Sequence, residues 1–183
     1  MIVIGLTGSP GSGKGTIANH LVNKHGAKQY RFSHALDDIL KRIHKPNSRD
    51  HQIKIALKLR EIFGDDILAY VLKKDILNEK PAIAVIDGMR YPKEFEMFEN
   101  IPGFKLIGVS TGIKKRYERI LSRGEKAGET NMTWEEFNDL EKRETEQHVS
   151  KLIEKADAQI KNDESENELT LKIDELIKEW TSK

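Results

Sequence analysis

The chain has no cysteine among its 183 residues. This absence excludes a disulfide framework, a thiol nucleophile and a thiolate-ligated metal. The sequence also lacks an excess of charge of either sign, because 31 Lys and Arg stand against 30 Asp and Glu, for a formal net charge of +1. Non-specific nucleic-acid binding needs a basic field that this balance does not supply. Nucleic acid is therefore not an expected partner.

Long apolar runs are missing as well. No stretch approaches the ~20 apolar residues that a membrane-spanning helix needs. The apolar run at 2–6 is short and leads directly into a glycine-rich segment, so we expect a strand there and no signal peptide. These features predict a cytoplasmic protein without a membrane partner, either a monomer or a small homo-oligomer. The length fits one domain, 1–183, with small inserted modules.

What the chain does have is a glycine-rich segment between an apolar run and a helical pattern. A strand, a glycine-rich turn and a helix in this order form a cradle for phosphate, because glycine permits close backbone approach and the helix N-terminus faces the anion. Lys14 adds a positive charge for the outer phosphates. The sequence therefore predicts a nucleoside triphosphate site, with ATP bound on Gly8, Ser9, Pro10, Gly11, Ser12, Gly13, Lys14, Gly15 and Thr16.

The residue after Lys14 departs from the general phosphate-binding loop. That loop places Ser or Thr directly after the lysine to ligate Mg²⁺, whereas this chain has Gly15 there and a hydroxyl one residue later, at Thr16. This spacing resembles the adenylate-kinase branch of nucleotide kinases, in which phosphates and water supply most of the Mg²⁺ ligands. Thr16 and Asp87 are the two candidate metal ligands of the chain.

Apolar runs and helical periodicities alternate along the rest of the chain, which indicates a parallel sheet flanked by helices. We expect an α/β fold with a five-stranded parallel sheet, a helical acceptor-binding insert at 33–78 and a helical lid at 112–155. The expected strands are 2–6, 29–32, 82–86, 104–109 and 156–160. The expected helices after the first are 33–44, 51–63, 65–78, 92–99, 112–122, 133–155 and 167–180.

Asp87 follows the apolar run at 82–86, and ligands of open parallel sheets bind beyond the carboxyl ends of the strands. A carboxylate there can hold Mg²⁺ through water or accept a proton; the alternative is a turn-forming residue before Gly88. Arg90 lies in the same crevice, where it can bind a phosphate with two hydrogen bonds or form a surface salt bridge.

Arg116, Arg119 and Arg123 share one face of a predicted helix, where like charges repel and an anion relieves the repulsion. A polyphosphate in transfer is such an anion; the alternative is a solvated face paired with Glu118 and Glu125. Helical residues further along, including Arg143, can close over the same ligand and exclude water.

Acceptor binding is assigned to the insert. Its candidate residues are Ser33, Asp37 and Arg60, although Arg60 also fits a structural ion pair. The six histidines, at 20, 25, 34, 44, 51 and 148, show no metal-ligand spacing, and most of them are expected at the surface.

These motifs resemble those of the P-loop nucleotide kinases. The first strand with its loop is similar to nucleoside monophosphate kinases, and residues 85–90, Val-Ile-Asp-Gly-Met-Arg, resemble their D-G-x-P-R segment, one residue shorter. Residues 119–123, Arg-Ile-Leu-Ser-Arg, match their R-I-x-x-R at the start of the lid. The match implies that Arg119 and Arg123 contact ATP and the transferring phosphoryl group.

The C-terminal part resembles a second group of these kinases. Residues 156–163 are similar to the A-D-x-x-I-x-N ending of dephospho-CoA kinases, which implies that the turn with Asn162 borders the adenine. Residues 59–64 and 86–90, with the tail, also resemble an uncharacterised archaeal branch of the superfamily. The chain lacks the G-D-x-x-R of adenylate kinases and the P-L-L-F-E of dephospho-CoA kinases, so the acceptor stays open.

The sequence as a whole predicts an enzyme that uses ATP and Mg²⁺ to phosphorylate a small nucleotide. A nucleoside or deoxynucleoside monophosphate is the preferred acceptor. Dephospho-CoA is the alternative acceptor, and an ATPase switch without a small acceptor is the alternative function.

Overall fold

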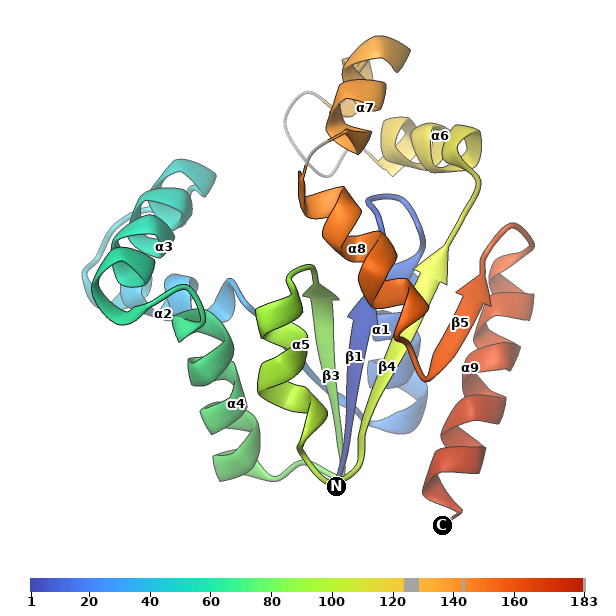
Figure 1. Ribbon diagram of the computed structural model, residues 1–183, viewed down its shortest axis with the longest axis horizontal. Helices are drawn as coiled ribbons and strands as arrows, with labels where there is room; N and C mark the ends of the chain where they lie inside the picture. The colour runs from blue at the N-terminus through green and yellow to red at the C-terminus, as the bar shows by residue number, and fades with distance from the viewer. Residues whose placement is uncertain (124–128, 143, 183) are drawn as a thin grey trace.

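A parallel sheet of five strands forms the centre of the molecule (Figure 1), in a computed structural model that describes residues 1–123, 129–142 and 144–182. The strand order is β2-β3-β1-β4-β5. The strands are β1 (Ile2–Thr7), β2 (Lys28–Arg31), β3 (Ile83–Met89), β4 (Phe104–Ser110) and β5 (Ala158–Lys161). All four strand pairings are parallel. The predicted α/β fold with a five-stranded parallel sheet is thus confirmed.

The third strand is longer than predicted, because it continues through Asp87 and Gly88 to Met89. Its pairing with β1 shifts between Leu6 and Thr7. At that shift, Thr7 Oγ1 donates a hydrogen bond of 2.9 Å to the carbonyl of Met89. Asp87 therefore lies near the C-terminal end of β3 and not after the strand. It lines the same cavity as the loop that follows β1.

Helices cover both faces of the sheet (Figure 1). One face carries α1 (Lys14–His25) and α9 (Glu166–Thr181), whose buried residues Leu21 and Ile173 pack with Ile4 and Val109. The other face carries α4 (Ile67–Glu79), α5 (Pro92–Glu99) and α8 (Glu144–Glu154). The core of this second face is built from Val3, Leu72, Ile86, Phe98 and Leu106. The central strands are buried on both sides, which explains why they read as continuous apolar runs.

The segment predicted as the insert forms three helices, of which α4 also packs on the sheet. They are α2 (His34–Arg42), α3 (Arg49–Phe63) and α4. Their small core consists of Leu36, Ala56 and Leu68. Ser48 begins α3, where its Oγ accepts a hydrogen bond of 3.3 Å from the amide of His51. In Figure 1 this group projects to the left of the sheet.

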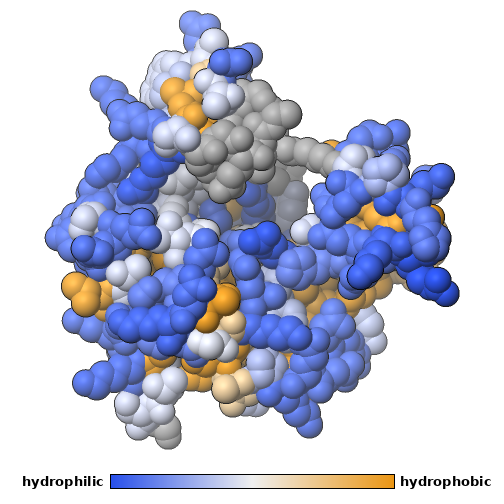
Figure 2. All heavy atoms as spheres, turned by 180° about the vertical axis from the view of Figure 1, so that it is seen from behind, coloured by the Kyte–Doolittle hydropathy of each residue, from blue (hydrophilic) through white to orange (hydrophobic). Residues whose placement is uncertain are grey.

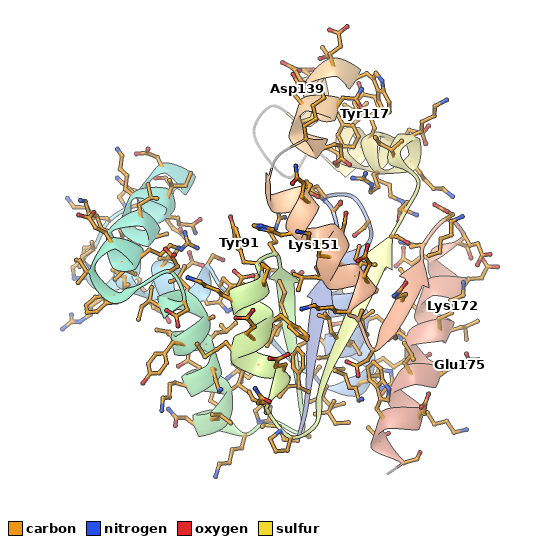
Figure 3. All side chains as sticks on the ribbon, in the orientation of Figure 1. Tyr91, Tyr117, Asp139, Lys151, Lys172 and Glu175 are labelled. Atoms are coloured by element: carbon orange, nitrogen blue, oxygen red, sulfur yellow. The ribbon has the colours of Figure 1, made fainter. Side chains whose placement is uncertain are left out.

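The predicted single helix at 133–155 is wrong. The structure has two helices here, α7 (Trp134–Glu141) and α8, and they pack on different partners. Helix α7 lies on α6 (Ile113–Arg123). Tyr117 of α6, labelled in Figure 3, contacts the rings of Trp134 and Phe137. Helix α8 lies on the sheet, where Ile153 approaches Gly108 of β4. Two different packing surfaces require a break between the two helices.

Helices α6 and α7 lie together above the sheet, at the top of Figure 1. A short 3₁₀ helix, Glu129–Asn131, lies in the predicted loop between them. Thr133 begins α7 as expected, because its Oγ accepts from the amide of Glu136 while the Glu136 carboxylate accepts from the amide of Thr133.

Charged and polar side chains dominate the face opposite to that of Figure 1, where apolar residues form small separate patches (Figure 2). No helix in the described part of the chain combines the length and apolarity needed to cross a membrane.

Candidate active site

The glycine-rich loop runs from the end of β1 to the start of α1. Its backbone requires glycine at Gly11 and Gly13, where φ is 77° and 103°, because other residues rarely adopt these angles. Space is also limited there. A Cβ on Gly11 would lie 2.7 Å from the carbonyl oxygen of Arg116, and one on Gly13 would overlap the Asn162 side chain. The loop is therefore packed from behind and open on its other side.

Asn162 holds this loop in place. The residue is buried, and its Nδ2 donates a hydrogen bond of 2.8 Å to the carbonyl of Ser12. Thr111 Oγ1 lies 3.0 Å from the same carbonyl and 3.2 Å from the carbonyl of Asn162. The segments after β4 and β5 thus position the phosphate-binding loop. The resemblance implied that the turn with Asn162 borders the adenine, which stays a prediction; the Asn162 side chain lies against the loop backbone.

Lys14 is the first residue of α1 and is largely buried. Its Nζ donates hydrogen bonds to two carbonyl oxygens of the loop, at 2.5 Å to Gly8 and 3.0 Å to Ser9. The ammonium group is therefore held against the loop whose amides form the predicted phosphate cradle.

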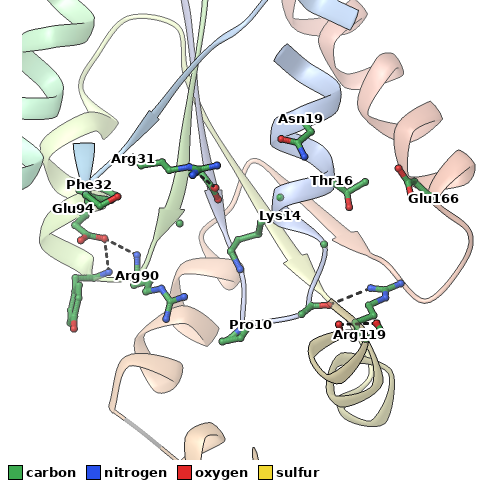
Figure 4. Close-up of a pocket in the computed structure, with 18 of the residues that line it drawn as sticks. Pro10, Lys14, Thr16, Asn19, Arg31, Phe32, Arg90, Glu94, Arg119 and Glu166 are labelled. Atoms are coloured by element: carbon green, nitrogen blue, oxygen red, sulfur yellow. Dashed lines mark hydrogen bonds and ion pairs between the residues drawn. The ribbon is translucent and has the colours of Figure 1, made fainter. Parts of the chain in front are cut away.

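One cavity of about 1020 Å³ extends from this loop to the insert (Figure 4). It brings together most of the predicted site residues. They are Pro10, Gly11, Gly13, Lys14, Gly15, Thr16, Ser33, Arg60, Asp87, Arg90 and Arg119. The remaining lining residues, which were not predicted as site residues, are Asn19, Arg31, Phe32, Gly88, Tyr91, Glu94, Ser122 and Glu166.

Some predicted residues lie outside the cavity lining. Gly8, Ser9 and Ser12 belong to the loop but do not line the cavity. Asp37 lies within the insert, where its carboxylate accepts a hydrogen bond of 2.5 Å from Gln52 Nε2 and links α2 to α3. The side chain of Arg123 and all of Arg143 lie outside the described residues, so their roles stay predictions.

Two arginines of α6 have different roles. Arg119 lines the cavity, and its guanidinium lies 3.4 Å from the Gly11 carbonyl and 3.2 Å from the Asn162 carbonyl. Arg116 is only 7% exposed and pairs with Glu141 of α7, with Nη1 2.8 Å from Oε1. The expectation that Arg116 faces a polyphosphate is wrong, because Glu141 already neutralises it. The partner lies 25 residues away, beyond the reach of helical spacing rules.

Asp87 and Arg90 lie at the end of β3. Asp87 Oδ2 accepts a hydrogen bond of 3.2 Å from Gln29 Nε2 and lies 3.7 Å from Arg31 Nε. Arg90 Nη1 lies 3.7 Å from Oε1 of Glu146, a buried residue of α8. Within the described residues, the other carboxylate oxygen of Glu146 has no hydrogen-bond partner. Arg90 thus lies between the cavity and a buried carboxylate.

Glu94 fixes the backbone beside these residues (Figure 4). Its Oε2 accepts hydrogen bonds from the amides of Arg90, at 2.7 Å, and Tyr91, at 3.1 Å. Burial raises the pKa of Glu94, while these two hydrogen bonds and the charges of Arg60 and Arg90 oppose the rise. The sequence did contain a signal for this contact, because Pro92 followed by Glu94 is typical of the first turn of a helix.

Known proteins match this chain in sequence over most of its length. Residues 4–147 match a family model described as an AAA domain. A UPF0200 protein of Pyrococcus abyssi is 30% identical over 182 residues, which covers 97% of this chain and 96% of the relative. A UPF0200 protein of Sulfurisphaera tokodaii is 32% identical over 178 residues, which covers 96% of each chain.

Solved structures share the fold at lower identity. Shikimate kinase from Acinetobacter baumannii, in complex with shikimate, matches with a TM-score of 0.57 and 17% identity over 97% of this chain and 93% of that one. An uncharacterized protein from Eubacterium ventriosum matches with a TM-score of 0.59 and 14% identity over the full length of both chains. The fold is one that shikimate kinase shares, and the chain belongs to the UPF0200 family.

Proposed function

We propose that this protein transfers the γ-phosphoryl group of ATP to a small nucleotide, with a nucleoside or deoxynucleoside monophosphate as the preferred acceptor class. The observation that carries the proposal is a single cavity with the phosphate-binding loop at one end and Arg31, Arg60 and Arg90 among its other lining residues. Its volume of about 1020 Å³ reaches the upper end of the range of ~300–1000 Å³ for sites that hold one small molecule. Such a volume fits two substrates.

The donor end is built from the loop and Lys14. Residues at the start of α1 line the cavity, and the amides of a helix N-terminus favour an anion. Lys14, held against the loop carbonyls, is placed to exchange those contacts for phosphate oxygens. Binding of the triphosphate would therefore release Lys14 from the loop without moving the backbone.

The cavity also offers oxygen ligands for a metal. Thr16 and Asp87 both line it, and hydroxyl and carboxylate oxygens are the ligand types that Mg²⁺ prefers. Bound Mg²⁺ would neutralise part of the charge that develops on the phosphates during transfer. Asp87 would in addition accept hydrogen bonds from Gln29 and hold Arg31 nearby, as it does in the structure.

Arg119 supplies the positive charge between donor and acceptor. Two backbone carbonyls, of Gly11 and Asn162, orient its guanidinium, so little reorganisation is needed when the phosphoryl group passes. Preorganised charge of this kind is usually the largest contribution to phosphoryl transfer.

The acceptor end combines positive charge with aromatic rings. Arg60 and Arg90 are suited to a phosphate monoester, because guanidinium groups bind phosphate through two parallel hydrogen bonds. Phe32 and Tyr91 line the same region and offer faces on which a base can stack. Rings beside arginines favour a nucleotide acceptor over a purely polar one.

The test is to incubate the protein with ATP and Mg²⁺ and to follow ADP release across a panel of acceptors. The panel contains nucleoside monophosphates, deoxynucleoside monophosphates and dephospho-CoA. We expect ADP release that depends on one of the monophosphates. A response to dephospho-CoA alone would reassign the acceptor.

The match to an AAA domain makes an ATPase switch the second candidate. ADP release at the same rate with and without every acceptor would favour the switch and contradict the kinase.

A further inference from the structure

A cluster of titratable side chains lies between α1 and α9, away from the cavity. His20 and His25 come from α1, and Asp174 comes from α9. The Nε2 atoms of the two histidines lie 2.8 Å and 2.7 Å from the same oxygen, Asp174 Oδ1. All three atoms lie within 4.8 Å of one another. None of these residues lines the cavity, so the proposed phosphotransfer does not use them.

The cluster is largely shielded from water. The side chains of His20, His25 and Asp174 are 17%, 19% and 22% exposed. They lie beside the apolar contact between the two helices, which includes Leu21 and Ile173. Their positions are therefore fixed by helix packing, and the site does not depend on mobile surface side chains.

Lys24 orients the carboxylate. Its Nζ lies 2.6 Å from Asp174 Oδ2, which leaves Oδ1 to face both imidazoles. An aspartate carboxylate is anionic near neutral pH, as a metal ligand must be.

The sequence pattern concealed this group for two reasons. The histidines are five residues apart, at the middle and the end of α1, so they do not show the i, i+4 spacing of two ligands on one helical face. The third member lies 149 residues after His25. Only the packing of α9 on α1 brings the three together.

We propose that His20, His25 and Asp174 bind a zinc ion, with one coordination position left for water. Two imidazole nitrogens and one carboxylate oxygen form a ligand set that suits Zn²⁺. Zn²⁺ holds such ligands at ~2.0–2.2 Å, so the present hydrogen bonds have to open slightly, by rotation of three side chains that already converge.

The ion fastens the C-terminal helix to the helix that follows the phosphate-binding loop. His20 is six residues from Lys14, or roughly 9 Å along the axis of α1. Metal binding to the folded state alone stabilises that state by mass action. We therefore expect the zinc site to support the loop through α1 without contacting the substrates.

The experiment uses the full chain, stripped of metal with a chelator and titrated with ZnCl₂ in a calorimeter at pH 7.5. We expect one ion per chain. The paired variant His20→Gln/His25→Gln should bind at least ~100-fold more weakly, because it loses two ligands outright, whereas loss of an outer partner alone costs ~10–100-fold. The matched control is His34→Gln, which removes an exposed histidine outside the cluster and should bind like the wild type.

Two further measurements keep the proposal falsifiable. Co²⁺ in place of Zn²⁺ should give the visible absorption of a four-coordinate site in the wild type and not in the paired variant. Asp174→Asn preserves the shape of the side chain and should weaken binding as well, so a folding defect of the paired variant would not leave the question open. Equal zinc affinity of the wild type and these variants, or no stoichiometric binding by the wild type, would overturn the site.

Discussion

Lys14 is the single residue on which the proposed transfer most depends. Its ammonium group is held against the phosphate-binding loop by two carbonyls, so its replacement removes a positioned charge. We expect Lys14→Ala to lower phosphotransfer by at least ~100-fold while the circular dichroism spectrum stays unchanged. Lys58→Ala, an exposed lysine of α3, is the matched control. Phosphotransfer at the wild-type rate in Lys14→Ala would remove the loop from the reaction.

Glu94 should make stability depend on pH. Burial raises its pKa above the ordinary value of 4.5, so the folded state holds this proton more tightly than the unfolded state. The stability from this preference is fully present below pH 4.5 and is lost as the pH rises through the folded-state pKa. We expect the free energy of unfolding of Glu94→Gln, relative to that of the wild type, to be higher at pH 7 than at pH 4. Urea unfolding of both proteins at the two pH values measures this difference. An unchanged difference between the two proteins would show that Glu94 does not titrate in this way.

Residue types and their local spacing were enough to predict many of the residues that line the cavity. The loop motif predicted that the glycines and Lys14 belong to the cavity, and the strand end predicted Asp87 and Arg90. Helical spacing and the R-I-x-x-R resemblance predicted Arg119. The contact between Arg116 and Glu141 could not, since it joins two helices across a segment whose path the sequence does not specify. The same holds for the hydrogen bond from Asn162 to Ser12, 150 residues apart.

Helix α6 carries two arginines, Arg116 and Arg119, to which we assign different roles. Arg116 and Glu141 form an ion pair with both side chains mostly buried, and removal of one partner leaves an uncompensated charge. We expect Arg116→Ala to lower the free energy of unfolding by about 3 kcal/mol, measured by denaturant titration. Arg119→Ala, one helical turn away, should cost less than ~1 kcal/mol. Equal costs for the two variants would contradict this division of roles.

In kinetics, Arg119 of α6 should matter more than Arg116. Arg119 lines the cavity and is oriented by two carbonyls, so it can stabilise charge that develops only during transfer. We expect Arg119→Ala to lower kcat by roughly 100-fold and to change the KM for ATP by less than about threefold. A large change in KM with kcat retained would make Arg119 a residue for ATP binding only.

At this scale the helix boundaries were harder to predict than the helices themselves. Periodicity predicted helices at 33–44, 51–63 and 65–78, where the structure has α2, α3 and α4. It could not show that 133–155 divides into α7 and α8, because both halves continue a helical pattern and only their different packing partners separate them. Similarly, β3 extends to Met89 because Thr7 pairs with it, which a strand pattern alone does not reveal.

For the molecule as a whole, the order of strands and helices was enough to predict the parallel sheet and the edge at which the site lies. Residues of the loop and of the 33–78 segment line the same cavity. The sequence could not specify the identity of the acceptor, because that depends on how Ser33, Arg60, Arg90, Phe32 and Tyr91 are placed together in space.

The central claim is that phosphate leaves ATP at the loop and arrives on a second molecule in the same cavity. The most direct measurement uses ATP labelled in its γ-phosphate, with Mg²⁺ and the acceptor that supports ADP release, and follows where the label goes. We expect the label in the acceptor, at one equivalent per ADP formed, and none transferred by Lys14→Ala. Label found only in inorganic phosphate, whether or not the acceptor is present, would contradict the claim.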